Sequence, residues 1–285
     1  MLPAATAADW PAVHARPLEA WWPALVHVSD RLGLPEGWTR LPGGEDSAVF
    51  AVGEHVLKLV PPCNAHDAIR ETNVLPRLDL GVPSPRLDAV LAIDGWTALH
   101  MSRLPGRPGN EVSGDLEEPA RLALMGELGS LLARIRRVPL TPEDGDASEL
   151  LAHLRLRAKR HEAAGFPDVD GFLDRHLRTD EPAFAHFDLT TGNVMLDEHG
   201  RLVGVLDFVA SRAFYPVFDL ITPGVFFAAG HPARLAALVE AARLQATAEE
   251  LTAWHLLHPC TDLERDLRMA GRSGVSVEAV VDLWR

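Results

Sequence analysis

The sequence predicts an α+β protein of two lobes, a small N-terminal lobe around an antiparallel sheet and a larger, mainly helical C-terminal lobe. Short runs of alternating apolar residues dominate the first third, which favours strands. From about residue 117 onward the apolar spacing becomes helical. Between them lies Ser102-Arg-Leu-Pro-Gly-Arg-Pro-Gly109, whose prolines and glycines are typical of a connector. We therefore expect lobes at 1–103 and 104–285.

The elements of the N-terminal lobe follow from spacing and from punctuating residues. Gly33 should end a first helix, Pro61-Pro62 should end a strand through Lys58, and Asp94-Gly95 should turn a hairpin. Asn64 should cap a helix that Gly81 ends. The predicted order is a helix at 18–33, a turn and strand at 41–53, a strand at 56–60, a helix at 64–80, and strands at 85–93 and 96–101.

The C-terminal lobe is expected to be helical around one block of short strands and turns. The predicted helices lie at 117–137, 148–164 and 168–178, strands and turns at 183–212, and further helices from 216 to the end.

Composition narrows the class of protein. The 285 residues carry 27 basic and 40 acidic side chains, a net charge of −13, which disfavours nucleic-acid binding and is compatible with a cationic small-molecule partner. No apolar run is long enough to cross a membrane, and the first ten residues lack the features of a signal peptide. Two cysteines fit a reducing compartment. We expect a cytoplasmic protein with no membrane or obligate protein partner; its oligomeric state stays open.

The segment 184–208 carries the residues of greatest chemical interest. Asp188 follows His186 by two residues, Asn193 follows five later, and Asp207 ends the next strand. Phosphoryl transfer uses a carboxylate that receives the hydroxyl proton, together with amide and carboxylate oxygens that hold Mg²⁺. A hairpin through Met195 and Val205 would bring Asn193 and Asp207 to one end of a ribbon. Isolated, these residues could equally cap turns.

Lys58 is one of only two lysines and lies in the apolar run Val56-Leu-Lys-Leu-Val60. It could protect an edge strand from pairing. The favoured interpretation is a phosphate-binding lysine, because an ammonium suits phosphate as a point charge. Glu71, on the next predicted helix, is the natural partner. The preceding turn Gly43-Gly-Glu-Asp-Ser47 would cover the phosphates, with Ser47 as a candidate contact.

With these residues in order, the sequence resembles the aminoglycoside phosphotransferase branch of the kinase-like phosphotransferases. His186-Phe-Asp188 and Asn193 resemble the catalytic loop of that family, and Leu206-Asp207-Phe208 resembles its metal-binding motif. Phe187 replaces the usual small residue; its side chain could point into the core.

The resemblance implies a two-lobed protein-kinase-like fold, with ATP or GTP as phosphate donor and Mg²⁺ as cofactor. Asp188 would be the general base and His186 would orient the loop. The main chain around Met101 and Arg103 would contact the purine. The resemblance is closest to hygromycin B phosphotransferases of the streptomycete type, which implies an aminoglycoside O-phosphotransferase that gives antibiotic resistance. Asp219 would brace the catalytic loop, and the short stretch before it leaves no room for the activation segment of a protein kinase.

The acceptor side is less defined. Asp262, Glu264 and Asp266 could bind ammonium groups of an aminoglycoside, or could form a solvated helix face with the pair Glu264–Arg268. His255 and His258 are expected to serve packing rather than metal binding.

Two alternatives remain. The same machinery could act on a metabolite such as choline, homoserine or a sugar. A silent binding module is disfavoured, because every expected catalytic side chain is present.

Overall fold

The computed structural model describes residues 2–3 and 6–285. The chain folds into two compact units. The first unit comprises Met1–Leu78 and Ser84–Leu104, and the second comprises Asp79–Pro83 and Pro105–Arg285. Each forms around its own buried side chains, as expected for a protein of this length.

The first unit is built on a five-stranded antiparallel sheet in the order β1-β2-β3-β5-β4. Asp94 and Gly95 both have positive φ and make the tight turn between the last two strands. The strands are β1 Thr39–Arg40, β2 Ala48–Val52, β3 His55–Val60, β4 Leu87–Ile93 and β5 Trp96–Ser102; the helices are α1 Trp10–His14, α2 Trp22–Leu32 and α3 Ala65–Val74.

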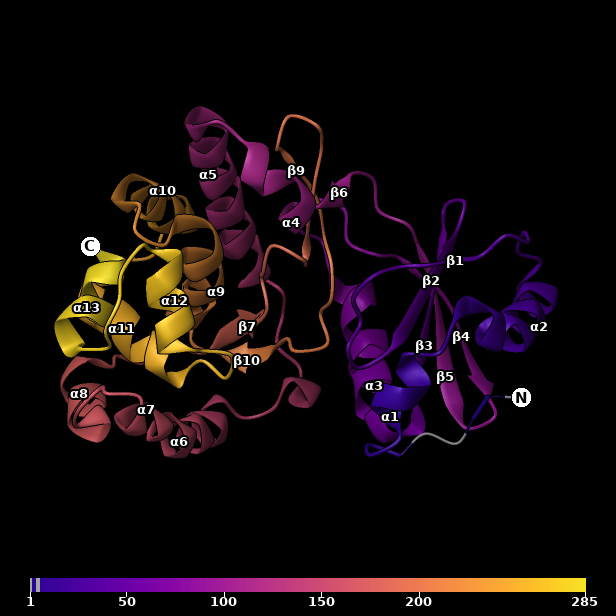
Figure 1. Ribbon diagram of the computed structural model, residues 1–285, viewed down its shortest axis with the longest axis horizontal. Coiled ribbons are helices and arrows are strands. Elements are labelled where there is room, and N and C mark those ends of the chain that lie inside the picture. Colours follow the sequence, from indigo (N-terminus) through magenta and orange to yellow (C-terminus); the bar gives the residue numbers. More distant parts are fainter. Residues whose placement is uncertain (1, 4–5) are drawn as a thin grey trace. The chain divides into compact units, whose positions relative to one another are not determined.

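Helices cover both faces of this sheet (Figure 1). Leu57 and Leu59 of β3 point into a cluster that includes Trp21, Leu25 and Trp96, where α1 and α2 pack. Because side chains alternate along a strand, Lys58 points to the opposite face, toward α3.

One predicted boundary in this unit is wrong. The helix expected at 64–80 ends at Val74, since Pro76 cannot donate an intrahelical hydrogen bond. Asn64 lies at the N-cap position of α3 as expected, but its side chain forms no capping hydrogen bond and donates to the carbonyl of Asp46.

The second unit is mainly helical. Its helices are α4 Gly109–Val112, α5 Glu118–Ile135, α6 Ala147–Ala158, α7 Arg160–Ala163, α8 Val169–His176, α9 Ile221–Pro223, α10 Pro232–Ala242, α11 Ala248–Leu257, α12 Leu263–Met269 and α13 Val277–Val281. Figure 1 shows α5 lying along α10. Gly129 permits this close approach, because a Cβ there would collide with the carbonyl of Leu238. The helix predicted at 148–164 is divided at Lys159 into α6 and α7.

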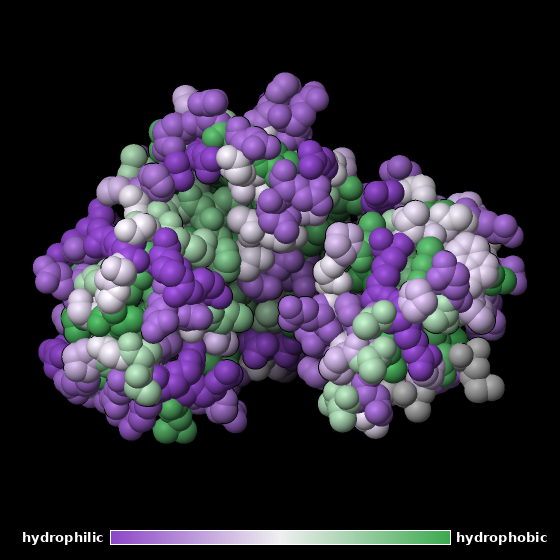
Figure 2. Space-filling view, in the orientation of Figure 1, coloured by the Kyte–Doolittle hydropathy of each residue, from purple (hydrophilic) through white to green (hydrophobic). Residues whose placement is uncertain are grey.

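Two small sheets carry the segment of greatest chemical interest. They are formed by β6 Arg107–Pro108, β8 Val194–Leu196 and β9 Leu202–Val205, and by β7 Ala183–Ala185 and β10 Arg212–Phe214. Figure 2 shows hydrophilic side chains over the turn between β8 and β9, as expected for an exposed hairpin tip.

The segment Asp79–Pro83 belongs to the second unit although the chain around it belongs to the first. The carbonyl of Pro83 accepts the N–H of Val205 at 3.0 Å, and that of Leu80 accepts Arg134 Nη1 at 2.8 Å. Among the described residues, no helix has the length and apolarity to cross a membrane.

Candidate active site

Lys58 and Glu71 form a buried ion pair in the first unit. Lys58 Nζ lies 2.7 Å from Glu71 Oε2, and the two residues are 8% and 2% exposed. β3 pairs with β2 on one side and β5 on the other, so Lys58 does not lie on an edge strand and cannot protect the sheet from pairing. A charge in this position needs its partner, because an unpaired buried charge is strongly unfavourable.

The glycine turn before β2 is tight. Gly43 and Gly44 have φ values of 89° and 72°, and a Cβ on Gly44 would lie 2.8 Å from the carbonyl oxygen of Ser47. Ser47, the predicted phosphate contact, is only 1% exposed, and its N–H donates to Gly44. Its hydroxyl therefore faces the interior of the turn.

The expected purine contacts are engaged within the first unit. Met101 lies in β5 between Val56 and Leu87 and is 4% exposed. The N–H of Arg103 donates to the carbonyl of Glu54 at 2.8 Å, so this donor is already satisfied.

In the second unit, His186 joins two stretches of backbone. Its Nδ1 accepts the N–H of Asp188 at 3.2 Å, and its Nε2 donates to the carbonyl of Leu206 at 3.0 Å. Complete burial lowers the pKa of His186 to about 4, so the ring is neutral and its two nitrogens keep these distinct roles. The histidine thereby ties Asp188 to the residue that precedes Asp207.

Phe187, between them, adopts a left-handed backbone with φ 73°. A β-carbon is strained there, which explains why a small residue suits this position. The ring packs against Phe214 and Phe218 in the core, and Arg212 lies over it. Asp219 accepts the N–H groups of His186 at 2.7 Å and Phe187 at 2.8 Å, which is the brace implied by the family resemblance.

The hairpin of β8 and β9 brings Asn193 beside Asp188. Val194 pairs with Val205, and the N–H of Leu206 donates to the carbonyl of Asn193 at 2.8 Å. Asn193 Nδ2 donates to Asp188 Oδ2 and to its carbonyl, both at 2.8 Å. With Nδ2 so engaged, Oδ1 is the atom that Asn193 can offer to a cation.

Asp207 immediately follows Leu206, whose N–H donates to the carbonyl of Asn193, and it has a positive φ of 58°. One amide oxygen and one carboxylate at the end of a hairpin suit Mg²⁺, which is commonly held by one or two protein groups together with phosphate oxygens. The described residues contain no cluster of three or more His, Cys, Asp or Glu side chains that could hold a metal by itself.

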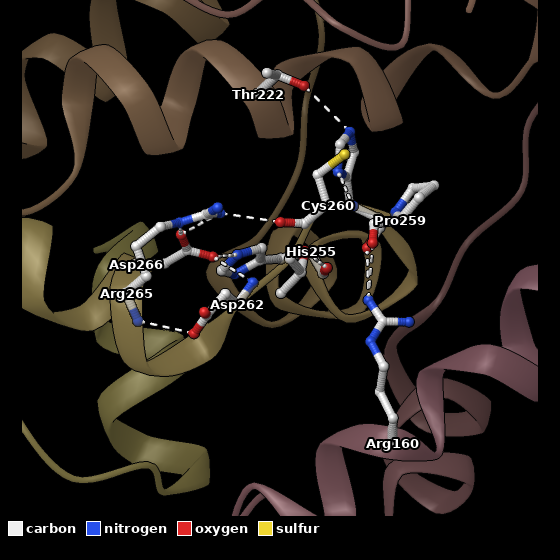
Figure 3. A network of polar contacts seen from close by, with 10 residues as sticks. Arg160, Thr222, His255, Pro259, Cys260, Asp262, Arg265 and Asp266 are labelled. Atoms are coloured by element: carbon white, nitrogen blue, oxygen red, sulfur yellow. Dashed lines mark hydrogen bonds and ion pairs between the residues drawn. The ribbon is translucent and has the colours of Figure 1, made fainter. Parts of the chain in front are cut away.

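A loop of five residues, 258–262, which we call the acceptor-side loop, lies against this catalytic loop. The network in Figure 3 joins it to the helices around it. Arg160 donates to the carbonyls of His258 and Pro259, and Arg265 donates to that of Cys260 at 3.0 Å. Partial burial raises the pKa of the Cys260 thiol, and the negative charge of Asp188 adds to this.

The three predicted acceptor carboxylates differ in position. Asp266 is 1% exposed and accepts from His255 at 2.9 Å and from Arg265 at 2.8 Å, so it has no surface to offer a ligand. Burial favours its neutral form, but these hydrogen bonds outweigh that effect and lower its pKa. Asp262 and Glu264 are exposed; Asp262 caps α12, and Glu264 lies 3.7 Å from Arg268.

A neutral catalytic loop histidine, a carboxylate beside an amide, and a second carboxylate at the end of a hairpin define, within this kinase-like fold, a small-molecule kinase. Residues 37–259 match the family model described as the phosphotransferase enzyme family, and the chain belongs to that family.

Solved structures with the same fold include a 2″-aminoglycoside phosphotransferase in complex with GDP and kanamycin. It is 15% identical, with 91% of this chain and 96% of that chain covered and a TM-score of 0.66. A macrolide 2′-phosphotransferase from Brachybacterium faecium is 20% identical, with 83% and 88% covered and a TM-score of 0.62. A 3″-aminoglycoside phosphotransferase from Streptomyces rimosus, in complex with ADP and streptomycin, is 16% identical, with 84% and 98% covered and a TM-score of 0.62.

Proposed function

We propose that the protein transfers the γ-phosphate of ATP or GTP to a hydroxyl group of an aminoglycoside such as hygromycin B and thereby gives resistance to it. The observation that carries this proposal is the contact between Asn193 Nδ2 and Asp188 Oδ2 at 2.8 Å. It sets a proton acceptor beside an amide oxygen that can hold a metal ion, as phosphoryl transfer requires.

Asp188 is the general base. The His186 ring accepts its N–H and Asn193 donates to its carbonyl, so the backbone of Asp188 is held on both sides. Its carboxylate can therefore accept the proton of an acceptor hydroxyl without prior rearrangement. His186 orients this loop from within the core.

Lys58 neutralises the α- and β-phosphates and is held by Glu71. Asn193 Oδ1 and the Asp207 carboxylate would hold Mg²⁺. When bound, the ion neutralises charge on the phosphate oxygens. Met101 and Arg103 remain candidates for the purine side, through groups other than the Arg103 N–H.

The structural relatives support a nucleotide and an aminoglycoside as substrates. One is described with GDP and kanamycin, and another with ADP and streptomycin. Asp262 and Glu264 are the exposed carboxylates of the acceptor side, and the net charge of −13 would attract a cationic acceptor.

The charged side chains around the acceptor-side loop favour a second candidate. Asp266 is buried against His255 and Arg265, while the Arg160 and Arg265 side chains lie along the loop. This balance suits a hydroxylated acceptor with few cationic groups, such as a sugar-like metabolite.

A panel of acceptors decides between the two candidates. Release of ADP or GDP would be measured with Mg²⁺ and hygromycin B, other aminoglycosides, choline, homoserine and simple sugars, beside a blank without acceptor. Turnover with hygromycin B alone supports the first candidate, and turnover with a neutral acceptor alone supports the second. No turnover with any acceptor, at saturating nucleotide, would contradict the proposed activity.

A further inference from the structure

His258 repeats the hydrogen-bond arrangement of His186. In each case Nδ1 accepts the N–H of the residue two positions later, which is Asp188 at 3.2 Å for His186 and Cys260 at 3.3 Å for His258. In each case Nε2 contacts a carbonyl from another segment. For His258 that carbonyl belongs to Phe187, at 3.1 Å.

The ring of His258 has a fixed protonation state. Burial lowers its pKa to about 4, so it is neutral near pH 7. Because Nδ1 accepts a backbone N–H, the proton resides on Nε2, and Nε2 donates toward Phe187. The hydroxyl of Thr222 lies 3.2 Å from Nε2 (Figure 3). The same hydroxyl donates to the carbonyl of Phe187 at 3.4 Å.

This carbonyl belongs to the peptide unit that leads into Asp188. The N–H of the same unit is held by His186, so the unit is fixed at both ends by histidine rings. Rotation of this unit would change ψ of Phe187 and φ of Asp188 and would redirect the Asp188 side chain. The left-handed φ of Phe187 is a strained conformation that persists only where its surroundings hold it.

We propose that His258 is a positioning residue of the phosphoryl-transfer site: through the carbonyl of Phe187 it holds the backbone that presents Asp188. The proposal rests on the proposed phosphotransferase activity. It also assigns a function to the acceptor-side loop, which is to hold the His258 ring in place. Arg160 donates to the carbonyls of His258 and Pro259, and Arg265 donates to the carbonyl of Cys260, whose N–H contacts the ring.

Two substitutions separate the two nitrogens. His258→Gln keeps a donor near the Nε2 position and loses the acceptor for Cys260, whereas His258→Asn keeps an acceptor near Nδ1 and loses the donor to Phe187. We expect kcat to fall about tenfold or more in His258→Asn and less than threefold in His258→Gln. The KM for nucleotide should change little in either, because the lost contact affects the orientation of the base rather than nucleotide binding.

His161→Asn is the matched control. His161 is also buried, at 3% exposure, and its pKa is also lowered to about 4, chiefly by burial, but it lies in α7. It should lose stability without a specific loss of kcat. If His258→Asn folds poorly, Thr222→Val removes one hydroxyl from the same carbonyl and should lower kcat about two- to fivefold.

Hydrogen exchange of the amides of 186–188 supplies a readout that does not need activity. We expect faster exchange in His258→Asn than in His258→Gln or in His161→Asn. Unchanged kcat in His258→Asn, or an equal loss in His258→Gln, would overturn the proposal. If the wild-type protein turns over no acceptor, the phosphotransferase proposal fails, while the exchange data still decide whether His258 orders the loop.

Discussion

At the scale of single residues, Asp188 is the side chain on which the proposed chemistry depends. Asp188→Asn keeps its size and an acceptor for Asn193, but an amide cannot take up the proton of a hydroxyl. We expect kcat to fall by about 10²–10⁴-fold. Nucleotide affinity should stay within about threefold, since the base acts on the acceptor. Steady-state product release and calorimetric titration with nucleotide would measure both.

Asp170→Asn is a suitable control, because Asp170 pairs with Lys159 on the exposed surface of the same unit. It should leave kcat unchanged. Full activity of Asp188→Asn would exclude Asp188 as the base.

Phe187 has a strained backbone and a buried ring. Phe187→Gly tests whether the strain or the packing of the ring contributes more to the free energy of unfolding. Glycine would relieve about 1–2 kcal/mol of left-handed strain. Loss of a buried phenyl ring costs about 3–5 kcal/mol, so we expect a net destabilisation of about 1–4 kcal/mol in urea unfolding. Phe187→Leu keeps the strain and part of the packing and should lose less. A Phe187→Gly protein more stable than the wild type would show that strain outweighs packing here.

At the scale of elements, β3 and α3 are joined by the buried pair of Lys58 and Glu71. Lys58→Met leaves the Glu71 carboxylate without its cation and should destabilise the protein by about 3–5 kcal/mol. Adding Glu71→Leu should recover much of this stability, because two apolar groups can replace a buried pair. Both the Lys58→Met variant and the double variant should fail to bind nucleotide.

The other lysine of the chain provides the comparison. Lys159 makes an exposed ion pair with Asp170, so Lys159→Met should cost about 0–1 kcal/mol. Similar losses for both lysines in chemical unfolding would contradict the assigned difference between them.

Much of the element order could be predicted, because alternation and helical spacing are local properties of the sequence. The hairpin around Asp94-Gly95 and the helix ending at Gly33 appear as expected. Gly81 predicts too late an end for α3, because Pro76 lacks the N–H needed to continue the α-helix.

The contacts of the candidate site were harder to predict. The hairpin expected through Met195 and Val205 places Asn193 near Asp188, and Glu71 is the glutamate of the next predicted helix after Lys58. Nothing in the sequence indicated the contact between His258 and the Phe187 carbonyl, which joins residues 71 positions apart. The exposure of Asp266 was also beyond prediction, because it depends on where His255 and Arg265 lie in the folded lobe.

At the scale of the whole molecule, buried histidines make stability depend on pH. His161, His186 and His258 each have a pKa lowered to about 4 by burial. The unfolded chain therefore binds more protons than the folded protein between about pH 4 and 6.5, and stability falls as the pH is lowered through this range. Burial raises the pKa of Asp219 to about 6, so the folded protein holds a proton on this carboxyl that the unfolded chain has lost. This effect cancels the contribution of one of the three histidines.

The net difference of about two protons predicts a loss of about 2–3 kcal/mol per pH unit between pH 6 and 5. Urea unfolding at pH 7, 6 and 5 would measure it. His258→Gln should reduce the pH dependence of stability by about half, since it removes one proton from the net difference of about two between the unfolded and folded states. Equal stability at pH 7 and 5 would contradict the neutral state assigned to these rings.

The excursion of Asp79–Pro83 into the second unit limits how the protein can be divided. The chain crosses between the units three times, after Leu78, Pro83 and Leu104. A protease that cuts the connector at 102–109 would therefore break only one of these connections. Expressed alone, residues 105–285 would lack the Pro83 carbonyl that accepts the Val205 N–H, next to the Leu206–Asp207 end of the hairpin. A C-terminal fragment that retains an ordered hairpin should therefore begin no later than Asp79.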